Sequence, residues 1–436
     1  MEPSMTDRLS GTDVEARGGA SPLGQAALCL TVGLLAVYGL FFIYSTGYIG
    51  DAYPVRPNWQ RQIVWLGIGS VLGWLLSRWD IRRDDWRLAV WLGYGVCVAS
   101  LVLVLSVGVK IGGARRWLAA GPLFVQPAEF AKLFTLLATA QVLGHPSWRW
   151  PVRWGVLLLV VLAPFMLILA EPSFGNAFAL LPAVFALVFF CVLPLWCWRA
   201  MLFLLVLAAL VMSAGLAWLR HNPPAFLEEG QAASSQKTMF FHDYHIRRLR
   251  SFLNPQGGWN ERQAVMTLAG GGVLGKGYLQ GTMKGLGYLP RTVAPTDFIF
   301  SVIGEEAGLL RGTLPVLLLY GILVSLGLHW AGHAADLRST LTGVALVMLL
   351  ATHVLVNVGM TVRLIPVIGL PLPLLSYGGS FTLATLMGIG IMAGIARQRG
   401  QPAPGESDGA SRQWRLGNLL TIKISRLEGT SRHDAP

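Results

Sequence analysis

Residues 23 to 44 read LGQAALCLTVGLLAVYGLFFIY, a stretch that contains no charged side chain. A helix that crosses a membrane needs roughly 20 consecutive apolar residues, so this stretch predicts a transmembrane helix. It is too long for the apolar region of a cleaved signal peptide, and no small-residue cleavage site follows it. Residues 88–109 and 200–218 have the same character. The chain is therefore expected to cross a membrane several times.

The composition excludes an ordinary soluble protein. Hydrophobic residues make up 54% of the 436 residues and charged residues 13%, with a mean hydropathy of +0.56. Soluble domains carry roughly 25% charged residues. The cysteines fall within or at the ends of apolar runs, and their spacing fits neither a zinc site nor a disulfide framework. We interpret them as small buried apolar residues: Cys29, Cys97, Cys191 and Cys197.

Apolar runs along the whole chain predict an all-α polytopic membrane protein with ten transmembrane helices. The predicted spans are 24–45, 62–78, 88–108, 127–143, 154–170, 175–194, 198–219, 298–328, 339–362 and 372–396. They form a membrane domain at 23–397, with a long extracytoplasmic loop at 220–296 between helices 7 and 8. The polar flanks, 1–22 and 398–436, are expected to be cytoplasmic tails, and the second is expected to be disordered.

Arginines in the short loops set the orientation, because loops rich in Lys and Arg stay in the cytoplasm. Such arginines lie in the loops 78–87 and 144–153. With an even number of spans both termini are then cytoplasmic, and the 220–296 loop lies outside.

The stretch GGGVLGKG, residues 270 to 277, satisfies the pattern G-x-x-x-x-G-K of nucleotide-binding loops but has Gly277 where Ser or Thr should hold magnesium. It also lies on the outer side, where ATP is absent, so we exclude a nucleotide site. Two interpretations stay open for Lys276: a point charge beside another phosphate, or a solvated lysine in a plain glycine-rich turn.

Cations in a short loop on the outer side are unexpected, because short loops rich in Lys and Arg usually stay in the cytoplasm. Lys110, Arg115 and Arg116 lie between the third and fourth spans. An anionic ligand would explain them, because Arg matches phosphate oxygens; contact with lipid head groups is the alternative. Glu129 and Lys132 are spaced i, i+3 inside the fourth span, so they are neighbours on one helix face. They either neutralise each other or line a polar cavity.

Asp297 places a carboxylate where the outer loop meets the eighth span, directly before the apolar run FIFSVIG. One role is helix capping, with Thr296 as an alternative cap. The other is a general base beneath the loop. In the ninth span, Asn357 is expected to form a helix–helix hydrogen bond and His353 to be a satisfied interior histidine.

Taken in order, several segments resemble the SEDS family (shape, elongation, division and sporulation), and the wording GKGYLQGT resembles its RodA branch more than its FtsW branch. The match runs from about residue 30 to 397. Its segments are GGARRWLAAGPLFVQPAEFAK, EPSFGNA, RLRSFLNPQ, LAGGGVLGKGYLQGTMKGLGYLP, TDFIFSVIGEEAG and NVGMTVRLIPVIGLPLPLLSYGGS. The combination of TDFIF with GLPLPLLSYGGS is the most specific part.

The resemblance implies a peptidoglycan glycosyltransferase that polymerises lipid II, an undecaprenyl-pyrophosphate-linked substrate, at the outer face of the bacterial cytoplasmic (inner) membrane during cell elongation. It implies a class B penicillin-binding protein, a transpeptidase, as partner, beside the lipid bilayer; no nucleic acid is expected. No cofactor is certain: magnesium could share the charge of the pyrophosphate, but no metal ligand is assigned.

The resemblance also implies roles for individual residues. Asp297 is the essential carboxylate and base of an inverting transfer. Arg116, Glu129 and Lys132 match family positions. The chemistry of a departing pyrophosphate adds cations as candidates, and the predicted substrate-binding residues also include two from the SYGGS stretch: Arg115, Arg247, Arg250 and Lys276, then Ser376 and Tyr377. The sequence departs from the family in three places: EPSFGNA stands where QPDLGTA is usual, LPRTVAP precedes Asp297 in a longer form, and Phe381 replaces a common Ser.

Three other functions remain open. A lipid II transporter, or flippase, would use the basic outer surface and the Glu129–Lys132 pair but would need no base at Asp297. No inverted repeat of the kind found in many carriers is visible. A division polymerase of the FtsW type would share the chemistry. A non-catalytic scaffold would need fewer spans and less charge.

Overall fold

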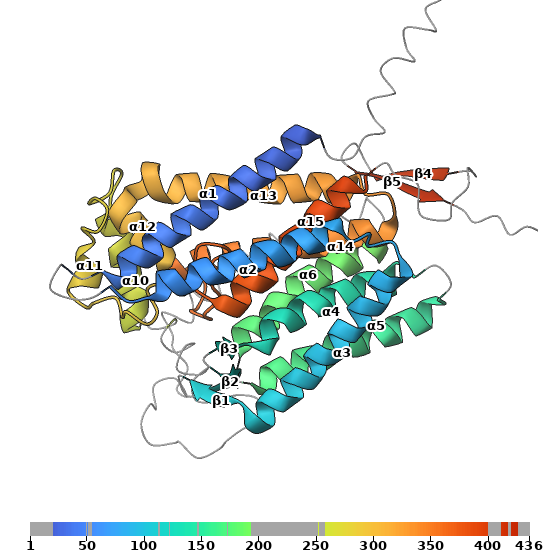
Figure 1. Cartoon of the computed structure of the whole chain (residues 1–436), viewed down its shortest axis with the longest axis horizontal. Coiled ribbons are helices and arrows are strands. Elements are labelled where there is room, and N and C mark those ends of the chain that lie inside the picture. Colours follow the sequence, from blue (N-terminus) through green and yellow to red (C-terminus); the bar gives the residue numbers. More distant parts are fainter. Residues whose placement is uncertain are drawn as a thin grey trace, which may run out of the picture.

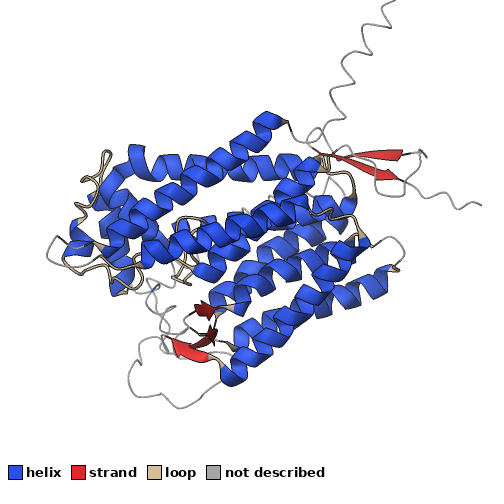
Figure 2. Cartoon of the chain, in the orientation of Figure 1, coloured by secondary structure: helices blue, strands red, loops and turns tan. Residues whose placement is uncertain are grey.

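The computed structural model describes residues 21–48, 50, 55–111, 114–121, 123–145, 148–171, 173–192, 252, 258–399, 411–416 and 420–425. They form a bundle of long helices, with a three-stranded sheet at one end and a two-stranded ribbon near the opposite end (Figures 1 and 2). The helices are α1 (Pro22–Gly47), α2 (Asn58–Arg78), α3 (Asp84–Val107), α4 (Pro127–Leu143), α5 (Trp150–Ala170), α6 (Phe174–Val192), α10 (Trp259–Gly270), α11 (Thr282–Gly285), α12 (Ile299–Gly308), α13 (Leu314–Gly332), α14 (Leu337–Thr361) and α15 (Gly379–Arg397).

The prediction of a polytopic α-helical membrane protein is confirmed. Six described helical stretches are long and apolar enough to cross a membrane, including the continuous stretch Ile299–Gly332. The other predicted spans fall on α2, α4 and α6, except 198–219, which lies outside the described residues. The fourth span has the bounds that the sequence predicted, 127–143.

Two spans differ most from their predictions, one in where it begins and one in its continuity. The last one begins at Gly379 rather than 372, because Pro371 and Pro373 lack the backbone N–H that a helix needs and keep the preceding segment as a loop. The eighth is divided into α12 and α13 by a π-helical turn, Leu309–Thr313, which follows Gly308 at φ +73°. A glycine adopts this left-handed conformation without the steric penalty of a Cβ.

Short strands are an addition that the all-α prediction missed. β1 (Val109–Ile111), β2 (Ala114–Ala120) and β3 (Leu123–Val125) form an antiparallel sheet in the order β1-β2-β3. Strands this short leave little periodicity to detect in a sequence. β4 (Ser411–Leu416) and β5 (Leu420–Ser425) pair as an antiparallel ribbon in the tail that we expected to be disordered.

Helix packing in the bundle depends on close backbone contact. A Cβ at Gly390 on α15 would lie 2.1 Å from the Gly73 carbonyl oxygen on α2, so these two helices touch through glycines, as is common in membranes. α14 and α15 are largely buried inside the bundle, whereas α3 and α5 turn most of their residues outward. The sheet β1–β3, α10, α11 and the start of α12 lie at one end, on the left of Figure 1. We call this the loop end.

Candidate functional site

Asp297 lies at the loop end in a tight turn that leads into α12. Its backbone N–H donates to the Val293 carbonyl at 3.0 Å, and Phe298 N–H donates to the same oxygen at 3.1 Å. The turn starts at Pro290, whose carbonyl accepts from Val293 and Ala294. The Asp297 side chain is half-buried. A short, hydrogen-bonded turn therefore holds this carboxylate at the surface of the bundle.

The structure does not support N-capping by Asp297. α12 begins at Ile299, and its N-cap residue is Phe298, which has no side chain able to cap. Asp297 lies one residue before that position. The alternative cap, Thr296, donates its hydroxyl to the Val293 carbonyl at 3.3 Å instead.

The loop 362–378 braces this turn from within the bundle. Tyr377 N–H donates to the Pro295 carbonyl at 2.8 Å, and the Ser376 hydroxyl donates to the Thr296 carbonyl. Ser376 is almost fully buried, and its oxygen also accepts from Leu372 N–H at 2.7 Å. These contacts place Ser376 and Tyr377 against the Asp297 turn. For Ser376 they favour a structural role over the substrate contact that the sequence predicted.

Asn357 on α14 contributes a side chain to the same turn. Its amide nitrogen donates to the Asp297 carbonyl at 3.0 Å and to the Leu370 carbonyl at 2.7 Å. Asn357 therefore does not form the expected helix–helix hydrogen bond, because its two partners lie in a turn and in a loop. The sequence signal was present, a polar amide inside an apolar span, but nothing in the sequence identified what it contacts.

A second polar group lies inside the bundle around Lys132. The Lys132 ammonium contacts Glu129 Oε2 at 2.9 Å, Asn176 Oδ1 at 2.8 Å and His353 Nε2 at 3.0 Å. Since His353 Nδ1 lies 2.8 Å from the Leu349 carbonyl, the proton belongs on Nδ1 and Nε2 accepts. The predicted pairing of Glu129 with Lys132 and the satisfied interior histidine are confirmed.

This polar group faces a cavity that extends to the loop 362–378. The cavity is lined by Glu129, Lys132, His353 and Phe381, with Pro373 from the loop, Thr385 and otherwise apolar residues. Both sequence interpretations of the ion pair therefore hold, because its charges neutralise each other and also line a cavity.

α14 connects the two groups. His353 and Asn357 are four residues apart and share one face of the helix, separated by about 6 Å along its axis. The Asp297 turn therefore lies roughly one helical turn beyond the charged cavity. The sequence placed these residues on different segments and did not bring them together.

Arg115 and Arg116 in the short outer loop direct their side chains toward different helices. Both lie on β2, where successive side chains point to opposite faces. Arg115 Nη1 donates to the Ser106 carbonyl at the end of α3, at 3.2 Å, whereas Arg116 Nε donates to the Glu171 carbonyl at the end of α5, at 3.3 Å. Two guanidinium groups that face different helices do not form one joint phosphate clamp in this state.

Glu171 is a buried acid that the sequence analysis did not select. It lies in the turn between α5 and α6, is fully buried, and neither carboxyl oxygen has a hydrogen-bond partner in the part of the chain that the structure describes. Burial raises the pKa of this carboxyl to about 8, against the attraction of the nearby Arg116. The sequence did carry a signal for this residue, because EPSFGNA has Glu171 where the family's usual QPDLGTA has glutamine.

Glu171→Gln should stabilise the protein in a pH-dependent way. The wild-type carboxyl ionises near 4.5 when exposed and near 8 when folded, so wild-type stability falls as pH rises through that window. Glutamine does not titrate. Thermal unfolding in detergent should therefore show the Tm advantage of the variant growing from pH 5 to pH 8. A Tm difference that stays constant over this range would contradict the prediction.

Lys276 has a protein partner. Its ammonium contacts Glu305 Oε1 and the Thr282 hydroxyl, each at 2.7 Å. It is therefore not the solvated lysine of a plain turn. The phosphate role remains a prediction, but it would require Lys276 to leave or share this carboxylate.

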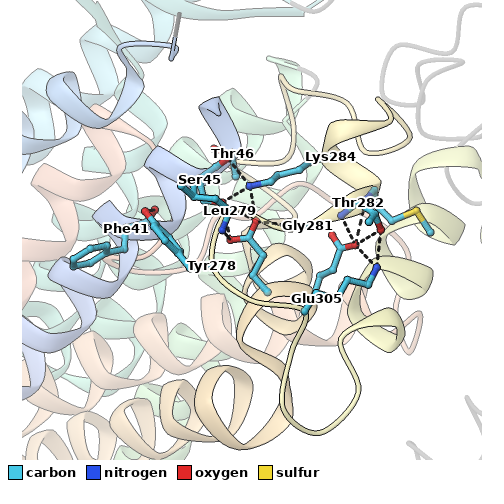
Figure 3. Close-up of polar contacts among 12 residues, drawn as sticks. Phe41, Ser45, Thr46, Tyr278, Leu279, Gly281, Thr282, Lys284 and Glu305 are labelled. Carbon is cyan, nitrogen blue, oxygen red and sulfur yellow. Dashed lines mark hydrogen bonds and ion pairs between the residues drawn. The ribbon is translucent and has the colours of Figure 1, made fainter. Parts of the chain in front are cut away.

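The loop around Lys276 wraps two carboxylates of α12. Glu305 accepts from the backbone N–H of Thr282 at 2.9 Å and of Met283 at 3.2 Å, while Glu306 accepts from Leu279 N–H at 3.1 Å. Lys284 pairs with Glu306 (Figure 3). Backbone N–H groups that resemble an anion cradle thus bind the chain's own acids.

The glycines of GGGVLGKG allow this docking. A Cβ at Gly271 would lie 1.9 Å from the Gly304 carbonyl oxygen, and one at Gly275 would lie 2.3 Å from the Glu306 carbonyl oxygen. The loop backbone therefore packs directly on the α12 backbone, and side chains larger than hydrogen would separate them. The motif's glycines serve this close contact.

Some predicted site residues cannot be placed. Arg247 and Arg250 lie outside the described residues. Among the residues that are described, no three His, Cys, Asp or Glu side chains are grouped so that they could hold a metal ion. No magnesium ligand is therefore assigned within the described residues, and no step of the reaction is assigned to a metal ion.

Comparison with known proteins gives a consistent result over the whole helical bundle. Residues 24–401 match the family model FTSW_RODA_SPOVE, described as cell cycle protein. The peptidoglycan glycosyltransferase RodA of Treponema pallidum is 29% identical, with the alignment covering 85% of this chain and 97% of that protein. The probable peptidoglycan glycosyltransferase FtsW of Mycobacterium tuberculosis is 32% identical, covering 92% and 72%.

Solved structures agree with this match. One described as "Structural coordination of polymerization and crosslinking by a peptidoglycan synthase complex" contains a chain that is 31% identical to this one. The superposition covers 86% of this chain and 98% of that chain, with a TM-score of 0.65. The fold is therefore shared across nearly all of the described helices.

Proposed function

This chain belongs to the FtsW, RodA and SpoVE family of cell cycle proteins, and we propose that, as a peptidoglycan glycosyltransferase, it polymerises lipid II with Asp297 as the base. The observation that carries the assignment of Asp297 is its setting. It is a half-buried carboxylate in a turn whose residues are held by α14 and by the loop 362–378. Preorganised groups of this kind are what general-base catalysis requires.

The reaction needs one base and a stabilised leaving group. The donor is a glycan chain on polyprenyl pyrophosphate, and the acceptor is the 4-hydroxyl of a second lipid-linked sugar. Asp297 accepts the hydroxyl proton as the oxygen attacks, because a sugar hydroxyl is too weak an acid to lose it beforehand. Pyrophosphate leaves without the protonation that an alkoxide leaving group needs. Direct attack inverts the α linkage of the donor to a β linkage.

Cations at the loop end are the candidates to stabilise the departing pyrophosphate. Arg116 is half-buried beside the α5–α6 turn, and Arg115 is exposed at the end of α3. Because their side chains diverge, we assign the two arginines separate roles. Arg116 contacts the leaving group from the bundle side, and Arg115 attracts the anionic head group at the membrane surface.

The location and partner follow from the same premises. The arginine-rich loops place the end opposite the loop end in the cytoplasm, so the Asp297 turn faces the outside of the bacterial cytoplasmic membrane, where lipid II is used. A solved relative belongs to a complex that coordinates polymerisation and crosslinking. We therefore assign a crosslinking class B penicillin-binding protein as partner. The GKGYLQGT wording favours elongation over division.

The test is reconstitution of the purified protein, with its partner transpeptidase, in liposomes that contain labelled lipid II. A ladder of glycan strands on a gel is expected. If no ladder forms and lipid II instead crosses the liposome membrane, the protein is a transporter and the proposal is wrong. A partner alone, without this chain, is the control for polymerisation by the transpeptidase preparation.

A further inference from the structure

The side-chain amide nitrogen of Asn357 holds two backbone carbonyls, whereas its Oδ1 has no hydrogen-bond partner within the described residues. The side chain is entirely buried, and its nitrogen donates one hydrogen bond to the Asp297 carbonyl at 3.0 Å and another to the Leu370 carbonyl at 2.7 Å. Since an amide nitrogen has two hydrogens, both are used. One side chain therefore joins α14, the turn that carries Asp297 and the loop 362–378.

The other braces of this turn act on neighbouring residues. Ser376 holds the Thr296 carbonyl, and Tyr377 N–H holds the Pro295 carbonyl. Asn357 holds the peptide group of Asp297 itself. Fixing that carbonyl fixes the plane of the Asp297–Phe298 peptide and hence the direction in which the Asp297 Cα–Cβ bond leaves the turn.

We propose that Asn357 is a positioning residue that holds the Asp297 carboxylate in the orientation needed to accept the proton of the attacking hydroxyl. The proposal rests on the proposed function of Asp297 and adds a second residue to it. Asn357 makes no contact with substrate, because it is buried beneath the turn. Its effect reaches the reaction only through the backbone of Asp297.

Catalytic groups tolerate little displacement. A productive geometry must hold to about 0.5 Å and 10–20°, and a misplacement of about 1 Å can lower the rate by about 100-fold. Loss of Asn357 frees the Asp297 carbonyl from α14 while Ser376 and Tyr377 still hold the adjacent residues. The turn should persist, but the Asp297 carboxylate should no longer be held in one orientation.

The experiment compares Asn357→Ala with Thr361→Val in the full-length protein reconstituted with its partner. Thr361 is equally buried and lies one turn further along α14, and its hydroxyl donates to the Asn357 carbonyl at 2.8 Å. Its replacement thus removes a buried hydrogen bond of the same helix without releasing Asp297. Both variants are matched for folded protein, and kcat and KM for lipid II are measured.

Asn357→Ala should lower kcat by about 10- to 100-fold, with KM within a few-fold of wild type, while Thr361→Val keeps both constants within a few-fold. If Asn357→Ala does not fold, Asn357→Ser, which retains a donor on a shorter side chain, should show the same split. An unchanged kcat in the folded Asn357 variant overturns the inference. So does an equal loss of kcat in Thr361→Val, or a raised KM with unchanged kcat.

Asp297→Asn, measured in parallel, separates this inference from the function beneath it. If that variant polymerises normally, the assignments of Asp297 as base and of Asn357 as its positioning residue are both wrong. If it is inactive while folded Asn357→Ala has full activity, the base stands and only the role of Asn357 is overturned.

Discussion

Asp297→Asn is expected to abolish glycan polymerisation, lowering kcat by about 10²- to 10⁴-fold, the usual contribution of a general base. Asparagine has nearly the same size and shape but cannot accept the proton of the attacking hydroxyl. The fold should survive, because the backbone N–H of Asp297 bonds to Val293 and its carbonyl to Asn357. Both of these groups remain in the variant.

Asp336→Asn is the matched control for this substitution. Asp336 is the N-cap of α14, where its side chain accepts from Arg338 N–H and Ser339 N–H, and asparagine caps helices equally well. Equal amounts of folded protein are supplied with labelled lipid II, and the products are resolved on a gel. Asp336→Asn should give wild-type ladders and Asp297→Asn none. Ladders from Asp297→Asn would require a different base.

The sequence predicts those features of the fold that depend on local periodicity. A run of apolar residues is enough to locate a span in a membrane protein, and the bounds of α4 agree with the prediction at both ends. Glu129 and Lys132 were paired from helical spacing alone, and their ion pair is present at 2.9 Å. Both inferences need only the geometry of one helix.

Contacts between distant segments could not be predicted in this way. Nothing local to Asn357 indicates that its amide meets Asp297, sixty residues earlier in the chain. The acids at 305 and 306 and the lysines of the outer loop were visible separately, but their pairing depends on how the loop folds back on α12. The stretch GGGVLGKG shows the same limit, because its glycines serve a backbone contact that only the tertiary structure reveals.

Lys132→Met should destabilise the fold by about 3–5 kcal/mol, the usual effect of breaking a buried ion pair by removing one partner. Lys132 is 1% exposed and Glu129 4%. An ammonium has three hydrogens, and Glu129, Asn176 and His353 accept all three. The variant leaves the Glu129 carboxylate buried without a counter-ion and loosens α4 from α6 and α14. Thermal unfolding in detergent and the yield of folded protein measure this effect.

Glu129→Gln combined with Lys132→Met separates the unpaired charge from the lost contacts. Because the double variant has no charge left at this site, it should recover most of the stability lost in Lys132→Met. A double variant as unstable as Lys132→Met would show that an unpaired charge is not the cause. Lipid II polymerisation by the folded double variant should remain at least about 10-fold below wild type, because the neutral side chains no longer hold the cavity beside the Asp297 turn in place. Wild-type polymerisation by this variant would instead make the ion pair a purely structural element of the bundle.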